Sequence, residues 1–213
     1  MIAMKILSIV SFQKKFRKTL ASVIRLDNGE EIRLEPDTIL EMNLHSGDEI
    51  SNERLNSIKS EDEKRKCIAK ALRLLAVRPR SEFEIKQGLQ REKFSFLAVD
   101  ASLAYLHEKG YLNDDQFAFQ WAKSRLKKKP MGAVSLKFEL KRKGIQDEQI
   151  RRVLEQLFTD DSEFEKAMIA GRKKITAYKK MDKIKMRQKM YLFLSQRGFA
   201  PDIIKRVTKE LIE

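Results

Sequence analysis

The chain has 213 residues, of which 42% are hydrophobic and 36% charged, and its formal net charge is +14. The eight glycines and four prolines are few, so helices should dominate. The single cysteine, Cys67, excludes an intramolecular disulfide, and no run reaches the roughly 18 apolar residues that a membrane-spanning helix needs. The apolar start, MIAMKILSIV, lacks a basic region and a cleavage site, so we expect no signal peptide and a cytoplasmic protein with no membrane partner.

The positive charge is concentrated in the C-terminal half. Residues 1–60 contain nine Lys/Arg and nine Asp/Glu, and residues 61–115 contain eleven and ten. In contrast, residues 116–158 contain eleven and four, and residues 159–213 contain fourteen and eight. Such a basic half is typical of a protein that meets a polyanion, with ordinary solvated helix faces as the alternative explanation.

Residues 1–58 predict a small β-containing head. The runs 4–11, 21–26 and 31–34 are apolar or alternating, which is typical of strands. Asn28-Gly29 between the last two runs predicts a hairpin with a type I′ turn, in which both central residues have positive φ. The side chains expected on the buried face are Ile24, Leu26, Ile32 and Leu34.

A short helix is expected after the strands. Pro36-Asp37-Thr38 should begin it, the helix should reach Leu44, and Gly47 should break it. The loop between the first two strands is basic, and it either touches phosphate or is simply solvated. Its cations are Lys14, Lys15, Arg17 and Lys18.

One apolar pattern occurs three times in the rest of the chain, with steps of 4, 5, 5, 4 and 3 residues. The copies are Ile85, Leu89, Phe94, Val99, Leu103, Leu106; Leu136, Leu140, Ile145, Ile150, Leu154, Leu157; and Met190, Leu194, Phe199, Ile204, Thr208, Leu211. A step of four keeps both residues on one helix face, so each copy predicts a helical hairpin. Thr208 is the one member that is not strongly apolar, and Val207 beside it can take its place.

The turns and helix starts complete this prediction. Gly144 and Gly198 fit the left-handed position just past a helix end, whereas Lys93 in the first copy should make its turn slightly less stable. A further helix should precede each hairpin. The expected capping boxes are Ser60…Glu63, Asn113…Gln116 and Ser162…Glu165, together with Ser81…Glu84 for the second helix of the first copy.

The resulting fold class is mostly α. We expect a β-containing head over residues 1–58, followed by three tandem three-helix repeats over residues 59–112, 113–158 and 159–213. Short modules that stack in series form an elongated, curved solenoid, and such a surface suits a polymeric partner.

Three motifs in these repeats resemble the RecX family, regulators of the bacterial RecA recombinase. They are LAVRPRSEFEI at residues 75–85, KGYLNDDQFA at 109–118 and KPMGAVSLKFELKRKGI at 129–145, and the resemblance covers residues 62–213. It implies binding to the groove of a RecA–DNA filament, with inhibition of strand exchange, ATP hydrolysis and coprotease activity. The implied partners are the RecA filament and single-stranded DNA, with double-stranded DNA as a further candidate, and we expect a monomer.

Cations of the second and third repeats are the candidate filament-binding or DNA-binding residues. Lys137 and Lys141 are four residues apart, so these like charges share a helix face at a cost of a few tenths of a kcal/mol, which indicates an external anion. Part of the tract also suits a helix C-terminus, which favours cations. The candidates are Arg125, Lys127, Lys128, Lys129, Lys137, Lys141, Arg142, Lys143, Arg172, Lys173, Lys174, Lys179 and Lys180.

The third-repeat tract continues through Lys183, Lys185, Arg187 and Lys189. Tyr178 is the one ring expected to be exposed there, so stacking on single-stranded bases is poorly supported.

Catalytic patterns are missing from the sequence. There is no Gly-rich phosphate loop or nucleophile–base grouping, and His45 and His107 are isolated from metal-ligand spacing. We therefore expect no enzyme, metal or cofactor. Three functions remain open: a RecA-filament regulator, a sequence-neutral DNA-binding protein that acts without RecA, and a nuclease, against which the missing carboxylate–metal group argues.

Overall fold

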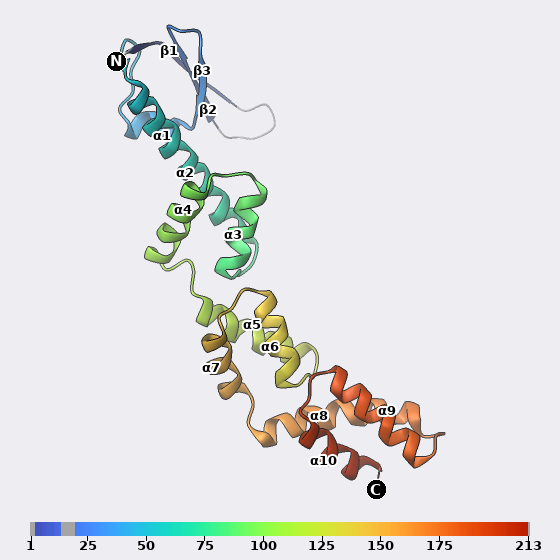
Figure 1. Cartoon of the computed structure of the whole chain (residues 1–213). Helices are drawn as coiled ribbons and strands as arrows, with labels where there is room; N and C mark the ends of the chain where they lie inside the picture. The colour runs from blue at the N-terminus through green and yellow to red at the C-terminus, as the bar shows by residue number, and fades with distance from the viewer. Residues whose placement is uncertain (1–2, 14–19, 213) are drawn as a thin grey trace. The chain divides into compact units, whose positions relative to one another are not determined.

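The computed structural model describes residues 3–13 and 20–212, so the predicted basic loop with Lys14, Lys15, Arg17 and Lys18 lies outside the described residues. Helices dominate, and a small antiparallel sheet lies near the N-terminus (Figure 1), as the composition predicted. The chain divides into two compact units. The N-terminal unit comprises Met1–Arg78 and Ile85–Tyr111, and the C-terminal unit comprises Pro79–Glu84 and Leu112–Glu213.

The head contains the three predicted strands and a fourth. β1 (Met4–Gln13), β2 (Leu20–Leu26) and β3 (Glu31–Leu34) confirm the strand predictions, and β4 (Glu49–Ile50) was not expected. The order is β3-β2-β1-β4 with antiparallel neighbours, and Met4 pairs with Ile50. The side chains predicted for the buried face are all buried: Ile24, Leu26, Ile32 and Leu34.

The β2–β3 hairpin is confirmed, but its predicted turn type is wrong. Gly29 has φ +83°, whereas Asn28 does not have a positive φ. The amide of Gly29 donates to Leu26 O at 3.1 Å, and that of Leu26 donates to Glu30 O at 2.9 Å. This pattern is a type I turn followed by a left-handed glycine bulge. It is favoured because the Asn28 side chain accepts the Glu30 amide at 2.9 Å and so stabilises the longer loop.

The short helix α1 (Pro36–Glu41) starts where predicted but ends three residues before Leu44. Asn43 adopts φ +50°, which a continuing helix does not tolerate, and the Leu44 amide bonds back to Ile39 O at 3.0 Å. Leu44 is buried in the core of the head.

The next helix, α2 (Asn52–Val77), corrects the predicted cap at Ser60. Its N-cap is Ser51, whose side chain accepts the Arg54 amide at 3.2 Å, and no glycine or proline interrupts the following turns. Its first turns place Leu55 and Ile58 in the core of the head. A boundary at residue 58 therefore falls inside a continuous helix, and the division of the chain into a head and three repeats remains our proposal.

A buried carboxylate joins α1 to α2. Asp62 accepts hydrogen bonds from the Thr38 hydroxyl at 2.9 Å and from the Glu35 amide at 2.7 Å, and it forms an ion pair with Lys66. Buried polar groups are stable when they are partnered in this way, so Asp62 anchors the start of α1.

Three three-helix repeats follow, which confirms the predicted fold class (Figure 1). Each predicted helical hairpin is present. After α2, the helices are α3 (Glu82–Arg91), α4 (Phe96–Glu108), α5 (Asp114–Lys128), α6 (Ala133–Arg142), α7 (Asp147–Leu157), α8 (Asp160–Ile175), α9 (Lys183–Gln196) and α10 (Pro201–Ile212), with the 3-10 turn η1 (Thr176–Tyr178) after α8.

The apolar stripe is confirmed in the middle helix of each repeat and in part in the last one. The middle helices bury Ile85, Leu89, Leu136, Leu140, Met190 and Leu194 completely. In the last helices, the predicted positions that are buried are Val99, Leu103, Leu106, Ile150 and Ile204. The other predicted positions, Leu154, Leu157, Thr208 and Leu211, are only partly buried, and Val153 and Val207 are buried in place of Leu154 and Thr208. Adjacent positions differ by about 100° around a helix, so a small rotation exchanges them at the edge of a buried face. Val207 does replace Thr208 in the core.

Of the three other predicted caps, two are confirmed and one is wrong. The Ser81 side chain accepts the Glu84 amide at 3.2 Å, and the Asn113 side chain accepts the Gln116 amide at 2.9 Å. Ser162 is not the N-cap of α8, because Thr159 holds that position and its hydroxyl accepts the Ser162 amide at 3.3 Å. Ser162 reciprocates by accepting the Thr159 amide at 3.0 Å.

All three repeat turns adopt the predicted left-handed conformation, with φ +64° at Lys93, +79° at Gly144 and +75° at Gly198. A Cβ on Gly144 would lie 2.2 Å from Phe83 Cβ, and one on Gly198 would lie 2.3 Å from Ser135 N. Lys93 is exposed, so its side chain is tolerated. Glycine is therefore required in the second and third turns by close packing as well as by φ.

Lys93→Gly is expected to raise the free energy of unfolding by about 1 kcal/mol, because a left-handed residue with a Cβ costs roughly that much. The expected shift in a thermal melt is about 2–4 °C for a chain of this size. The control is the reverse substitution, Gly110→Lys, because Gly110 has φ +70° and open space around it. This variant should lower the free energy of unfolding by a similar amount. A melt in which Lys93→Gly is less stable than the parent would contradict this explanation of the turn.

Candidate nucleic-acid interface

The second and third repeats are joined by backbone contacts between two segments far apart in sequence. Gly132 N donates to Arg197 O at 2.9 Å, and Val134 N donates to Gly198 O at 3.2 Å. The Arg197 guanidinium also donates to Pro130 O at 3.1 Å. The start of α6 is therefore held against the α9–α10 turn, and the basic helices of both repeats belong to one compact unit.

The α6–α7 turn of the second repeat is likewise hydrogen-bonded to the residues at the start of α3. Ser81 Oγ donates to Lys143 O at 2.6 Å, and Lys143 Nζ forms an ion pair with Glu84 at 2.7 Å. Lys143 also lies over the Trp121 ring, 5.8 Å from its centroid. Lys143 is one of the predicted binding residues, and its side chain already has two internal partners, Glu84 and Trp121.

A half-buried carboxylate completes the junction between the repeats. Glu163 on α8 accepts the Ala133 amide at 3.1 Å, at the N-terminus of α6. Burial raises the pKa of the Glu163 carboxyl, and the hydrogen bond from the Ala133 amide opposes that rise. The ionised carboxylate is favoured where a helix N-terminus presents free amides.

Arg125 is also committed to the fold. Its guanidinium makes two parallel hydrogen bonds to the Glu139 carboxylate, at 2.7 and 2.8 Å, and so links α5 to α6. These bonds raise the pKa of Arg125. A bidentate pair of this kind has a fixed geometry, so Arg125 is less available to an external phosphate than a free lysine.

Most of the other predicted binding residues are exposed and have no carboxylate partner. No ion pair joins them to any residue in the ranges 3–13 and 20–212. They are Lys127, Lys128 and Lys129 at the end of α5, Lys137 and Arg142 on α6, Lys173 on α8, and Lys179 and Lys180 after η1.

The remaining candidates have weak partners. Lys141 Nζ lies 2.8 Å from the exposed Asp147 carboxylate and lowers the pKa of Asp147 through this hydrogen bond, and Arg172 lies 4.0 Å from Glu210. Lys174 lies over the rings of Tyr178 and Phe193. Exposed pairs contribute only about 0–1 kcal/mol, so a phosphate can replace these carboxylates at little cost.

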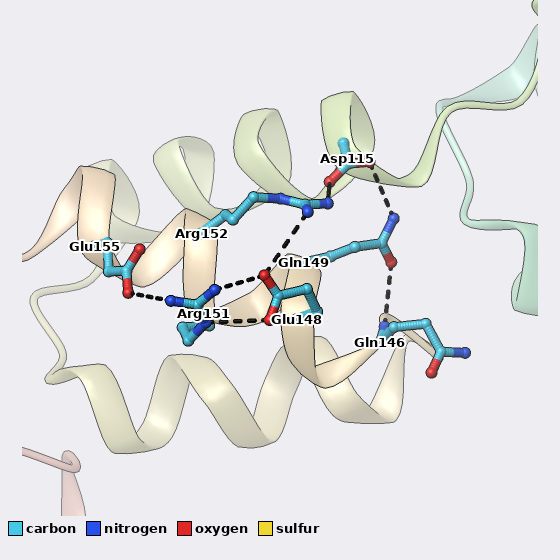
Figure 2. Close-up of polar contacts among 7 residues, drawn as sticks. All are labelled: Asp115, Gln146, Glu148, Gln149, Arg151, Arg152 and Glu155. Carbon is cyan, nitrogen blue, oxygen red and sulfur yellow. Dashed lines mark hydrogen bonds and ion pairs between the residues drawn. The ribbon is translucent and has the colours of Figure 1, made fainter.

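By contrast, the two arginines of α7 are paired with carboxylates of α7 and α5 (Figure 2). Arg152 pairs with Asp115 at 2.6 Å, and Arg151 pairs with Glu148 at 2.6 Å and Glu155 at 3.0 Å. Gln149 donates to Asp115 at 3.2 Å and ties α7 to the start of α5. The hydrogen bonds from the two arginines lower the pKa of Asp115 and of Glu148. The basic surface of the second repeat therefore lies on α6 and the end of α5.

The prediction that Tyr178 is the exposed ring is wrong. Tyr178 is half-buried and packs against the core of the third repeat. The exposed rings of the C-terminal unit include Phe138 on α6 and Tyr191 on α9, which the sequence patterns did not single out. Both lie one or two residues from fully buried stripe positions, and that spacing was the signal that they face solvent.

The part of the chain that the structure describes contains neither a candidate metal site nor a helix suited to span a membrane. It contains no group of three or more His, Cys, Asp or Glu residues that could hold a metal ion. No helix within it is both long enough and apolar enough to cross a membrane.

Comparison with known proteins finds three matching family models, which together follow the three repeats. They are the first, second and third three-helix domains of RecX, at residues 67–106, 113–154 and 161–208. "Regulatory protein RecX" of Listeria monocytogenes is 30% identical over 207 residues, covering 97% of this chain and 76% of that protein. The protein with the same description from Chlorobium phaeobacteroides is 34% identical over 147 residues, covering 69% and 94%.

Solved structures agree at the level of the fold. A crystal structure of regulatory protein RecX superposes with a TM-score of 0.77 at 22% identity, covering 98% of this chain and 100% of that chain. The crystal structure of RecX from Lactobacillus salivarius gives a TM-score of 0.66 at 24% identity, covering 71% and 97%.

Proposed function

Because this chain belongs to the RecX family, we propose that it binds the RecA–DNA filament and mainly inhibits its recombinase, ATPase and coprotease activities. Its relatives are named regulatory proteins, and a regulatory role follows from that membership. The observation that carries the finer proposal is the set of exposed cations without carboxylate partners in the C-terminal unit. In this role the protein acts in the cytoplasm as a monomer without a cofactor.

The physical basis of binding is phosphate neutralisation. Each lysine or arginine that contacts a phosphate releases condensed counterions, so affinity should fall steeply as salt rises. Lys127, Lys128 and Lys137 meet this requirement, since they are exposed and form no ion pair with any described residue. Contacts from cations to phosphates carry no sequence information, which suits a partner defined by its backbone rather than its sequence.

Sequence-neutral DNA binding without RecA is the second candidate, because the same cations would serve it. The two functions differ in whether tight binding and inhibition need the recombinase. A nuclease is disfavoured, since a two-metal or one-metal phosphodiesterase needs clustered carboxylates and the described residues contain no such cluster.

Titration of this protein into single-stranded-DNA-dependent ATP hydrolysis by purified RecA, at fixed salt, tests the proposal. We expect inhibition well below one protein per RecA monomer, unmatched by an equally basic control protein. Inhibition only at amounts that coat the DNA would instead identify a plain DNA-binding protein. Magnesium-dependent loss of the DNA strand in the absence of RecA would identify a nuclease.

A further inference from the structure

The solvent face of α6 combines apolar and cationic side chains. Val134 and Phe138 are 50% and 66% exposed and lie four residues apart, and Arg142 continues the same row. Lys137 and Lys141 form the neighbouring row. Positions three and four apart are neighbours on a helix surface, so the Phe138 ring lies among cations.

The exposed ring is not needed by the bundle core. The buried positions of α6 are Leu136 and Leu140, on the opposite side of the helix from Phe138. A single exposed apolar residue would need no explanation. Here, however, the ring lies on a helix whose one acidic residue, Glu139, is already paired with Arg125.

The equivalent face of the third repeat also exposes apolar residues, with its ring at the position of Lys137 rather than that of Phe138. Leu136 and Met190 are equivalent stripe positions, so Lys137-Phe138 of α6 corresponds to Tyr191-Leu192 of α9. Tyr191 and Leu192 are 44% and 58% exposed. The α9 sequence, KIKMRQKMYLFLSQ, contains no acidic residue.

Cations flank the apolar pair of α9 as they do on α6. Lys185, Lys189 and Leu192 are spaced four and three residues apart and therefore share one row. Both lysines are exposed. In the first repeat the equivalent pair is Lys86-Gln87, with no ring, and that repeat also lacks the positive excess. At this pair of positions an exposed ring therefore occurs only in the two basic repeats, whereas the exposed ring of α3, Phe83, lies at the position of Val134.

We propose that the faces of α6 and α9 are two sites for single-stranded DNA, in which Phe138 and Tyr191 each stack on an unpaired base. Lys137 and Arg142 contact the adjoining phosphates in the first site. In the second site Lys185 and Lys189, which lie in the row of Leu192 rather than beside Tyr191, contact phosphates further along the strand. Every base has a π-face, so such stacking tolerates any sequence. The inference rests on the proposed filament function and deepens it by naming the chemistry of the strand.

Charge complementarity favours a nucleic acid over an apolar protein helix. An apolar partner would offer no anion to the lysines and arginine of these faces, whereas a DNA strand offers both a base for the ring and phosphates for the cations. On the α9 face, Lys185 pairs with the exposed N-cap residue Asp182 at 3.4 Å, a surface pair that a phosphate can replace at little cost.

The test uses the full-length protein without RecA and a fluorescently labelled thymidine oligonucleotide, with the Kd measured by anisotropy over a range of salt concentrations. Phe138→Ala and Tyr191→Ala are each expected to weaken binding about tenfold, because truncating a stacked ring removes that much affinity. The slope of log Kd against log salt should not change, since no cation is removed. Phe138→Trp should restore tight binding.

Phe96→Ala is the matched control, because Phe96 is 75% exposed but lies in the first repeat. It should bind the oligonucleotide as the parent does, and all variants should keep the parent's circular dichroism spectrum because the rings are outside the core. Unchanged Kd values for both Phe138→Ala and Tyr191→Ala overturn the inference. So does loss of RecA inhibition without loss of oligonucleotide binding, which would assign the rings to a protein contact.

The two proposals fail separately. Ring-dependent oligonucleotide binding without any effect on RecA ATP hydrolysis would support the stacking sites and refute the filament function. Potent RecA inhibition by a protein whose oligonucleotide binding is insensitive to both ring substitutions would do the reverse.

Discussion

Gly132→Ala is expected to destabilise the C-terminal unit by on the order of 3 kcal/mol, because the new methyl group has no space. A Cβ at this position would lie 2.1 Å from the Gly198 carbonyl oxygen and 2.5 Å from Phe199 Cα. These are backbone atoms that cannot rotate away. The start of α6 would have to move off the α9–α10 turn, which would break the Gly132 and Val134 amide hydrogen bonds.

The backbone conformation of Gly132 itself is not the reason for this effect. Gly132 has φ −84°, which alanine adopts without strain, so the loss reports the close approach alone. Denaturant unfolding gives the free energy, and hydrogen exchange at the Gly198-bound amide of Val134 gives the site. That amide should exchange much faster in the variant.

Gly110→Ala provides the matched control for Gly132→Ala. Gly110 has φ +70°, and a Cβ added there would meet nothing within 4 Å, so its replacement should cost only the left-handed strain, about 1 kcal/mol. Equal losses from the two substitutions would contradict the packing explanation. The comparison also tests why the KPMGAV segment contains a glycine at this point.

Reversal of Lys137, Lys141 and Arg142 to Glu is expected to weaken binding to the RecA–DNA filament on the order of a hundredfold at moderate salt. Three cations that we propose as phosphate contacts are lost and three repelling charges replace them. The slope of log affinity against log salt should fall by about 3, one for each contact removed. Inhibition of RecA ATP hydrolysis should weaken in parallel.

The fold should survive this triple reversal. All three side chains are exposed, and the ion pair that is lost, between Lys141 and Asp147, is a solvent-exposed pair worth at most about 1 kcal/mol. Arg33, Arg91 and Lys109 are exposed cations of the N-terminal unit, and reversing them to Glu changes the net charge equally. That control should inhibit RecA nearly as well as the parent. Full inhibition by a correctly folded variant with Lys137, Lys141 and Arg142 reversed would contradict the assignment of α6 as a filament-binding surface.

The architecture could be predicted from the amino-acid sequence because the features that encode it are local. Asn28-Gly29 marked a hairpin, and a spacing of 4, 5, 5, 4 and 3 marked each helical hairpin. Gly144 and Gly198 marked the turns, since a left-handed residue needs no partner to favour glycine. The charge excess of the C-terminal half was likewise visible from composition.

Which cations and rings are available to a binding partner depends on the tertiary structure. Arg125 and Lys143 looked like their neighbours in sequence, but carboxylates on other helices pair with them. Tyr178 packs into a core while Phe138 faces solvent, because burial depends on which helices meet rather than on local composition. The same holds for Gly132, whose need for glycine comes from a backbone segment more than sixty residues away.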